Sequence, residues 1–223
     1  ADHSVPATPA VAIARLAAFG TAGDGWVDPA LDTALGDRDP DVATAAALAL
    51  GRHGKRGLPL LDRDIHALDV ASTSAELRVR YAATWALAQL VVAPRSAPGG
   101  FARPYVAPDR SRDAMASMAQ PQLPPSSWPF AEALAARVTD ADPAIRAVAI
   151  AGLAKHGDVG AARGAIVAAL RDPDWRVAVE AVRALAGPHG DDAGRDAVAT
   201  ELVRRWDALA AGDGAQAQVV TEG

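Results

Sequence analysis

Recurring acid–base pairs are the residues whose types and spacing could do chemistry in this chain of 223 residues. In three copies of a repeated pattern an acidic residue precedes an arginine by four positions, which places the two on one face of a helix in the favourable order. The pairs are Glu76 and Arg80, Asp142 and Arg146, and Asp172 and Arg176. We expect each pair to form within its helix and to hydrogen-bond to the next repeat.

The same charges could instead form a binding strip on one side of the molecule. Glu180 and Arg183 follow Arg176 by four and seven positions, so all three share one helical face. Such a strip could hold a peptide backbone or an acidic tail. The simpler interpretation is structural, because exposed ion pairs contribute little individually.

Large apolar side chains concentrate in one irregular stretch of an otherwise alanine-rich chain. They are Phe101, Tyr105, Met115, Met118, Trp128 and Phe130. This stretch could fold back over the molecule as an internal plug. Alternatively, it could form a patch that binds a partner. Both interpretations remain open at this point.

Histidines are the other candidates for chemistry. His53 and His156 each follow a proline by thirteen positions, and His189 lies just beyond a later glycine. A metal site is conceivable, but we expect a structural role, because a helix's last turn favours an imidazole near its carbonyl groups. The sequence contains no nucleophile elbow, phosphate loop or metal-binding helix motif. It therefore predicts no catalytic residue, no metal and no cofactor.

Copies of one helical pattern position these residues. Asp142-Pro143 and Asp172-Pro173 each open a copy, and the two prolines are 30 positions apart. Aspartate is a good N-cap and proline suits the first helical position. An apolar residue stands two places after each proline (Ile145 and Trp175), followed by the arginine. A glycine fourteen places after the proline, Gly157 or Gly187, should end each helix.

Two more copies fit the same frame. Asp39-Pro40 opens one that reaches Gly54, with Ala43 in the arginine position. The other opens at Glu76, and Thr73 with Glu76 suggests a capping box in place of Asp-Pro. Self-similarity at such a period indicates stacked helical hairpins.

The pattern resembles the HEAT repeat, in the short bacterial form also found in phycobilisome-lyase-like proteins. This resemblance implies an all-α, right-handed superhelix (an α-solenoid) of about five helical hairpins with one long irregular loop. A weaker resemblance links ALALGRHG and RYAATWALAQL to the HEAT-repeat portion of bacterial cyclophilin-type prolyl isomerase fusions. Lyase-like and DNA-glycosylase-like HEAT proteins are further alternatives, although the glycosylases' basic face and motifs are not found here.

The predicted organisation has five parts: a lead-in (1–8), N-terminal repeats (9–93), a Pro/Ser/Gly-rich loop (94–127), C-terminal repeats (128–211) and a polar tail (212–223). Half of the residues are hydrophobic and 4% are aromatic, so stability must come from many modest contacts. Net charge is −5 with no basic block, which disfavours nucleic acid as a partner. No apolar run approaches membrane-spanning length.

The chain starts at Ala1 without methionine and contains no cysteine. A removed export signal would produce such a start, and so would trimming. Taken together, the sequence predicts a non-catalytic scaffold that binds a protein or peptide. The expected contacts are the loop residues Phe101, Tyr105, Met115, Met118 and Trp128, or the charged residues Arg80, Arg146, Arg176, Glu180 and Arg183.

Overall fold

Helices form all the regular structure in the part of the chain that can be described. The computed structural model describes residues 12, 30–56, 60, 62–90 and 130–210. The helices are α2 (Ala30–Leu35), α3 (Pro40–Lys55), α4 (Asp62–Ala71), α5 (Leu77–Gln89), α7 (Ala131–Arg137), α8 (Pro143–His156), the 3-10 helix η2 (Val159–Ala162), α9 (Arg163–Ala169), α10 (Trp175–Ala186) and α11 (Asp192–Ala210).

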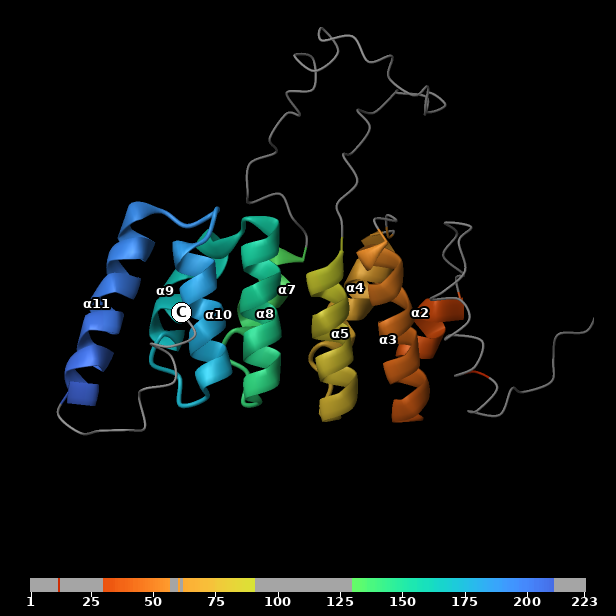
Figure 1. Cartoon of the computed structure of the whole chain (residues 1–223). Helices are drawn as coiled ribbons and strands as arrows, with labels where there is room; N and C mark the ends of the chain where they lie inside the picture. The colour runs from red at the N-terminus through yellow and green to blue at the C-terminus, as the bar shows by residue number, and fades with distance from the viewer. Residues whose placement is uncertain (1–11, 13–29, 57–59, 61, 91–129, 211–223) are drawn as a thin grey trace, which may run out of the picture.

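The helices stack in two rows (Figure 1). Helices α3, α5, α8 and α10 form the inner row, and each contacts the next. Helices α2, α4, α7 and α9 lie behind them, each packed on its inner partner, and α11 packs on α10 at the end of the array. The predicted all-α solenoid is confirmed, with four complete helical pairs and α11 among the described residues.

The core runs continuously between the rows and is built mainly from alanine and branched aliphatic side chains. One position near the start of each inner helix is buried in all four copies, namely Val42, Val79, Ile145 and Val177. Small residues let neighbouring inner helices approach closely. A Cβ added at Gly152 of α8 would lie 2.7 Å from the Cβ of Ala88 on α5.

Three of the four inner helices begin at a common Asp-x-Asp arrangement, and this corrects the predicted period. Asp142 caps α8 as expected, accepting from the N–H groups of Ala144 and Ile145, while Asp140 accepts from the N–H of Asp142. In the next copy Asp172 takes the place of Asp140, and Asp174 caps α10. The predicted N-cap at Asp172-Pro173 is therefore wrong. The repeat period here is 32 residues, because Asp140 and Asp172 occupy equivalent positions.

Asp39 follows the same rule, since its carboxylate accepts from the N–H of Asp41 at the start of α3. The predicted Thr73 capping box is wrong. The N-cap of α5 is Glu76, whose N–H donates to the Ser74 hydroxyl, and the Thr73 hydroxyl donates instead to the carbonyl of Val70.

The glycine expectation holds at two of the three positions. Gly157 caps α8 with φ 78°, a left-handed conformation that favours glycine, and Gly187 ends α10. Gly54 instead lies inside α3, which continues to Lys55. An added Cβ there would lie 3.1 Å from the Cα of Leu90, so Gly54 serves close packing of α3 on the end of α5.

The predicted division into five parts stays a prediction. Residues 1–8, 94–127 and 212–223 all lie outside the described residues.

Candidate binding surface

Two of the predicted arginines form an arginine–aspartate ladder, meaning the pairs Arg80–Asp140 and Arg146–Asp172. Arg80 Nε lies 3.1 Å from Asp140 Oδ2. Arg146 binds both carboxylate oxygens of Asp172 at 2.8 Å and also donates to the carbonyls of Asp140 and Ala141. Hydrogen bonding to Asp172 outweighs partial burial and raises the pKa of Arg146.

The ladder decides between the two predicted kinds of pairing. A link from repeat to repeat is confirmed, by hydrogen bonds for Arg146 and by an ion pair for Arg80. The pairs within one helix are wrong for these two arginines, whose carboxylate partners belong to the following repeat. Both arginine side chains are mostly covered, at 18% and 16% exposure. Their place in the structure is a buried link between repeats.

The other predicted charged residues lie on the surface of α10. Arg176 pairs with Asp174 at 2.7 Å, and Arg183 pairs with Glu180 at 2.8 Å. Hydrogen bonding to the Arg176 guanidinium lowers the pKa of Asp174. Both arginines remain largely exposed, so the predicted charged strip lies on the surface of the folded molecule. Each of its arginines is already paired with a carboxylate of this chain.

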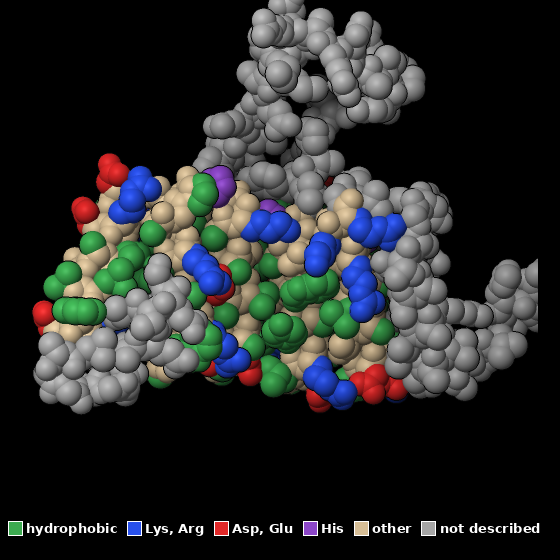
Figure 2. All heavy atoms as spheres, viewed as in Figure 1, with side chains coloured by type: hydrophobic (Ala, Val, Ile, Leu, Met, Phe, Trp, Pro, Cys, Tyr) green, Lys and Arg blue, Asp and Glu red, His purple; other side chains and the backbone are tan. Residues whose placement is uncertain are grey.

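One solvent-facing stripe runs along each inner helix, and together the four stripes form what we call the inner-helix face (Figure 2). It consists of residues at helical spacing that are not buried: Asp41, Thr44, Ala45, Leu48, Arg52 and Lys55 on α3; Arg78, Tyr81, Trp85 and Gln89 on α5; Ala144, Ala147, Val148, Ala151 and Lys155 on α8; and Arg176, Glu180 and Arg183 on α10. Apolar and basic side chains lie side by side on this face (Figure 2).

An aromatic pair occupies the middle of the inner-helix face. Tyr81 is 38% exposed, and Trp85 lies one turn further along the same side of α5. A Cβ added at Gly51 of α3 would fall 2.4 Å from Trp85 Cζ3 and 2.7 Å from Cε3. The Trp85 ring therefore lies directly against the backbone of α3. No role was assigned to Tyr81 or Trp85 from the sequence, although their spacing of four was a usable signal.

Basic residues flank the aromatic pair. Lys155 of α8 reaches across to α5, where its Nζ donates to the carbonyls of Ala88 and Gln89 at 3.3 Å. Burial and the nearby charge of Lys55 lower the pKa of Lys155. The chain's two lysines thus meet on this face, although they are 100 positions apart in sequence.

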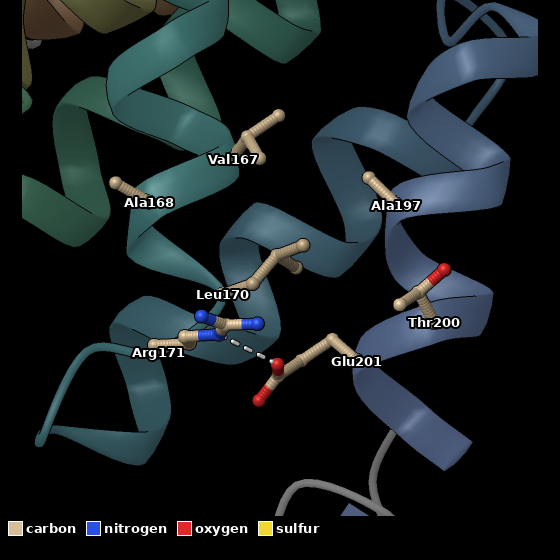
Figure 3. A pocket seen from close by; sticks show the side chains of 7 residues that line it. All are labelled: Val167, Ala168, Leu170, Arg171, Ala197, Thr200 and Glu201. Atoms are coloured by element: carbon tan, nitrogen blue, oxygen red, sulfur yellow. Dashed lines mark hydrogen bonds and ion pairs between the residues drawn. The ribbon is translucent and has the colours of Figure 1, made fainter. Parts of the chain in front are cut away.

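A hollow of about 320 Å³ lies between α9 and α11, at the other end of the array (Figure 3). Its lining residues are Val167, Ala168, Leu170, Arg171, Ala197, Thr200 and Glu201. Glu201 is 4% exposed and accepts hydrogen bonds from Arg171, Arg204 and Arg205. Burial opposes ionisation of Glu201, but the hydrogen bonds and charges of these arginines outweigh it and lower its pKa to about 2.

This cluster attaches the last helix to the rest of the array. Arg205 also donates to the carbonyl of Leu170, at 2.6 Å. The opposite side of α11 presents Val203 and Trp206, which are 61% and 64% exposed. The hollow's charged groups are engaged with one another, which indicates a structural joint.

The histidines have structural surroundings. His53 is 2% exposed in the last turn of α3, as expected from its position. His156 packs edge-on against Phe130, with ring centroids 4.7 Å apart, and burial lowers its pKa to about 4. His189 lies near Gly157. Among the described residues, no three His, Asp or Glu side chains gather closely enough to hold a metal ion.

The predicted loop contacts cannot be placed on this surface. Phe101, Tyr105, Met115, Met118 and Trp128 lie outside the described residues. Whether that stretch is a plug or a partner patch stays an open prediction.

Comparison with known proteins agrees with the fold. Residues 131–212 match the family model for HEAT repeats. The crystal structure of an engineered protein from the Northeast Structural Genomics Consortium is similar, with a TM-score of 0.57 and 17% identity over 98% of this chain and 90% of that one. At this identity the likeness shows the fold alone. No curated protein matches the sequence.

The predicted resemblance to HEAT repeats is therefore confirmed for residues 131–212, and the described part of the chain has the fold of an all-helical repeat protein. None of its described helices is both long and apolar enough to cross a lipid bilayer.

Proposed function

We propose that this protein is a non-catalytic scaffold that holds a protein or peptide segment on its inner-helix face. The observation that carries the proposal is the aromatic pair of exposed Tyr81 and partly buried Trp85 on a regular stack of helices. Aromatic residues are frequent among the few side chains that dominate binding energy at protein interfaces. HEAT-like solenoids present extended surfaces of this kind.

The arginine–aspartate ladder supports the proposal indirectly. It joins α5 to α8 and α8 to α10, so the inner helices that carry the face are held in register with one another. A surface that is already ordered loses less conformational freedom when a partner binds. The ladder arginines themselves act in this proposal as supports rather than as contacts.

The loop between 94 and 127 remains a second candidate for partner contact, because of its methionines and aromatic residues. Its role is distinguishable by experiment from that of the inner-helix face. A variant in which Tyr105, Met115 and Met118 are changed to alanine should retain binding if the inner-helix face is sufficient.

Site-specific photocrosslinking in the cell of origin tests the proposal. A photoreactive amino acid would replace Thr44 or Ala147 on the inner-helix face, or Arg63 or Glu132 on the outer helices as matched controls. We expect discrete crosslinked partners from the first two positions and not from the controls. Crosslinks that arise equally from both sides, or from the outer helices alone, would contradict the proposal.

A further inference from the structure

The inner-helix face has the opposite charge to the chain as a whole. The chain's net charge is −5. Along the four stripes, however, six cations stand against two carboxylates and a third, Asp174, which pairs with Arg176 at the edge of the face. The cations are Arg52, Lys55, Arg78, Lys155, Arg176 and Arg183, and the first two carboxylates are Asp41 and Glu180. Like-charge repulsion disfavours basic partners on this face and attraction favours acidic ones.

The Trp85 ring is prearranged for an apolar contact. Its Cζ3 and Cε3 atoms occupy the space that a side chain at position 51 would need, and Ala86 Cα lies 2.9 Å from the same point. One side of the ring is therefore fixed against α3. A ring held in this way presents its exposed part without losing rotamer freedom on binding.

Aliphatic side chains smaller than the aromatic rings flank the aromatic pair. Leu48 of α3 lies on one side, and Ala147 and Val148 of α8 lie on the other, all partly buried. Tyr81 and Trp85 consequently stand as the large apolar groups in the centre of the face. One apolar side chain of a partner could pack against these two rings and anchor the partner there.

Two basic groups lie beyond Trp85, at the last turns of α3 and α5. Arg52 directly follows Gly51 on α3 and is exposed, while Lys155 spans from α8 to the last turn of α5. Neighbouring packed helices are about 8–10 Å apart. Because Lys155 Nζ lies at the end of α5, about one helix spacing separates its position from α3, which about three residues of extended chain would cover.

We propose that the inner-helix face binds an extended acidic segment of another protein, with one apolar side chain against Tyr81 and Trp85 and carboxylates toward Arg52 and Lys155. This inference rests on the proposed function and specifies its partner. The net cationic charge of the face and the fixed aromatic ring support it independently.

The test is selection of twelve-residue peptides from a random displayed library against the purified chain, followed by calorimetric titration of the enriched peptides. We expect enriched sequences with acidic residues close to an apolar one. Enrichment of neutral or basic sequences, or no enrichment, would overturn the inference. So would tighter binding of a single-stranded oligonucleotide of equal charge.

Variants of the chain then test where the peptide binds. Tyr81→Ala should weaken binding about tenfold, as expected for an interface anchor. The double variant Arg52→Gln/Lys155→Gln should weaken binding and reduce its dependence on salt. The matched controls are Val203→Ser/Trp206→Ser, which removes exposed apolar groups from α11, and Arg195→Gln. Equal losses in the controls would contradict the assignment.

The results separate this inference from the proposed function. If the inner-helix positions crosslink to a partner but acidic peptides are not enriched, the scaffold role stands and the acidic segment is wrong. If neither crosslinks nor peptides are obtained, both fail.

Discussion

Two junctions between inner helices are built differently. At the α3–α5 junction, glycine permits close approach, since Gly51 lies against Trp85 and Gly54 lies against Leu90. At the α8–α10 junction, the bidentate pair of Arg146 and Asp172 joins the helices.

The arginine–aspartate ladder does not extend to the α3–α5 junction. The positions that correspond to Arg146 and Asp172 are Ala43 and Ser74 at the α3–α5 junction, so both ladder partners are replaced together. The α5–α8 junction combines both devices, with Gly152 against Ala88 and the pair Arg80–Asp140. Packing and charge thus join repeats separately or together, since the exposed pair of Arg78 and Asp41 also links α5 to α3 at 2.6 Å. The closely packed α3–α5 junction is the one that holds the Trp85 ring.

Acid should weaken the α5–α8 junction most strongly. Burial lowers the pKa of His156 from 6.5 to about 4, so the unfolded chain binds a proton first as pH falls. Stability is therefore complete above pH 6.5 and is lost progressively down to pH 4, by about 3 kcal/mol. Urea unfolding across this pH range measures the loss.

His156→Gln is the matched variant and should flatten the pH dependence between 6.5 and 4.5. Glu201, whose pKa is lowered to about 2, contributes stability that is lost only as pH falls through the region from 4.5 to 2. An unchanged slope in His156→Gln would show that another group governs the acid response.

Gly51→Ala should damage the α3–α5 junction. The added methyl would overlap the Trp85 ring, and it could not be relieved by moving the ring alone because Ala86 Cα is 2.9 Å away. We expect a loss of about 2–3 kcal/mol in the free energy of unfolding, as for overpacking in a core. Gly164→Ala is the control, since nothing lies within 4 Å of the added Cβ, and it should not destabilise the chain. Equal effects would show that close packing at Gly51 is unimportant.

Arg146→Met should damage the α8–α10 junction. It leaves the Asp172 carboxylate and two backbone carbonyls without their donor, although Asp172 still accepts from the N–H of Asp174. We expect a loss of about 2 kcal/mol, because the abandoned groups are only partly exposed. Arg183→Met removes an exposed pair and should change stability little. If both variants behave alike, the ladder does not hold the junction.

Introducing an arginine–aspartate pair at the α3–α5 junction would test how far the two junctions differ. Ala43→Arg alone should destabilise the α3–α5 junction, since Ala43 is buried. Adding Ser74→Asp should recover part of that loss, with a coupling energy of about 1 kcal/mol in a double-mutant cycle. Zero coupling would mean that the two junctions differ in more than these two residues.

Much of the fold could be predicted from the sequence, because helix caps and helical spacing are local signals. Asp142, Pro143 and Gly157 gave both ends of α8 correctly. The predicted helix start was wrong in the next copy. There the Asp172-Pro173 pair suggested a start two residues too early, whereas Asp172-x-Asp174 marks the start of α10. Asp-x-Asp was present in three of the copies and could have been recognised.

The candidate surface was harder to predict, because exposure depends on neighbours that are remote in sequence. Trp85 is held by Gly51, and Lys155 reaches the end of α5, contacts that no local pattern reveals. The ladder was partly predictable, because acid–base spacing identified the arginines. Their true partners belong to the following repeat, which spacing alone could not assign.

The most direct test of the central claim is an NMR titration of the labelled chain with an acidic peptide enriched on it. If the aromatic pair at the packed junction binds the partner, the largest amide shifts will fall in Leu48–Arg52 of α3 and Tyr81–Gln89 of α5. Shifts concentrated around the ladder at Asp140–Arg146, or on α11, would contradict the account.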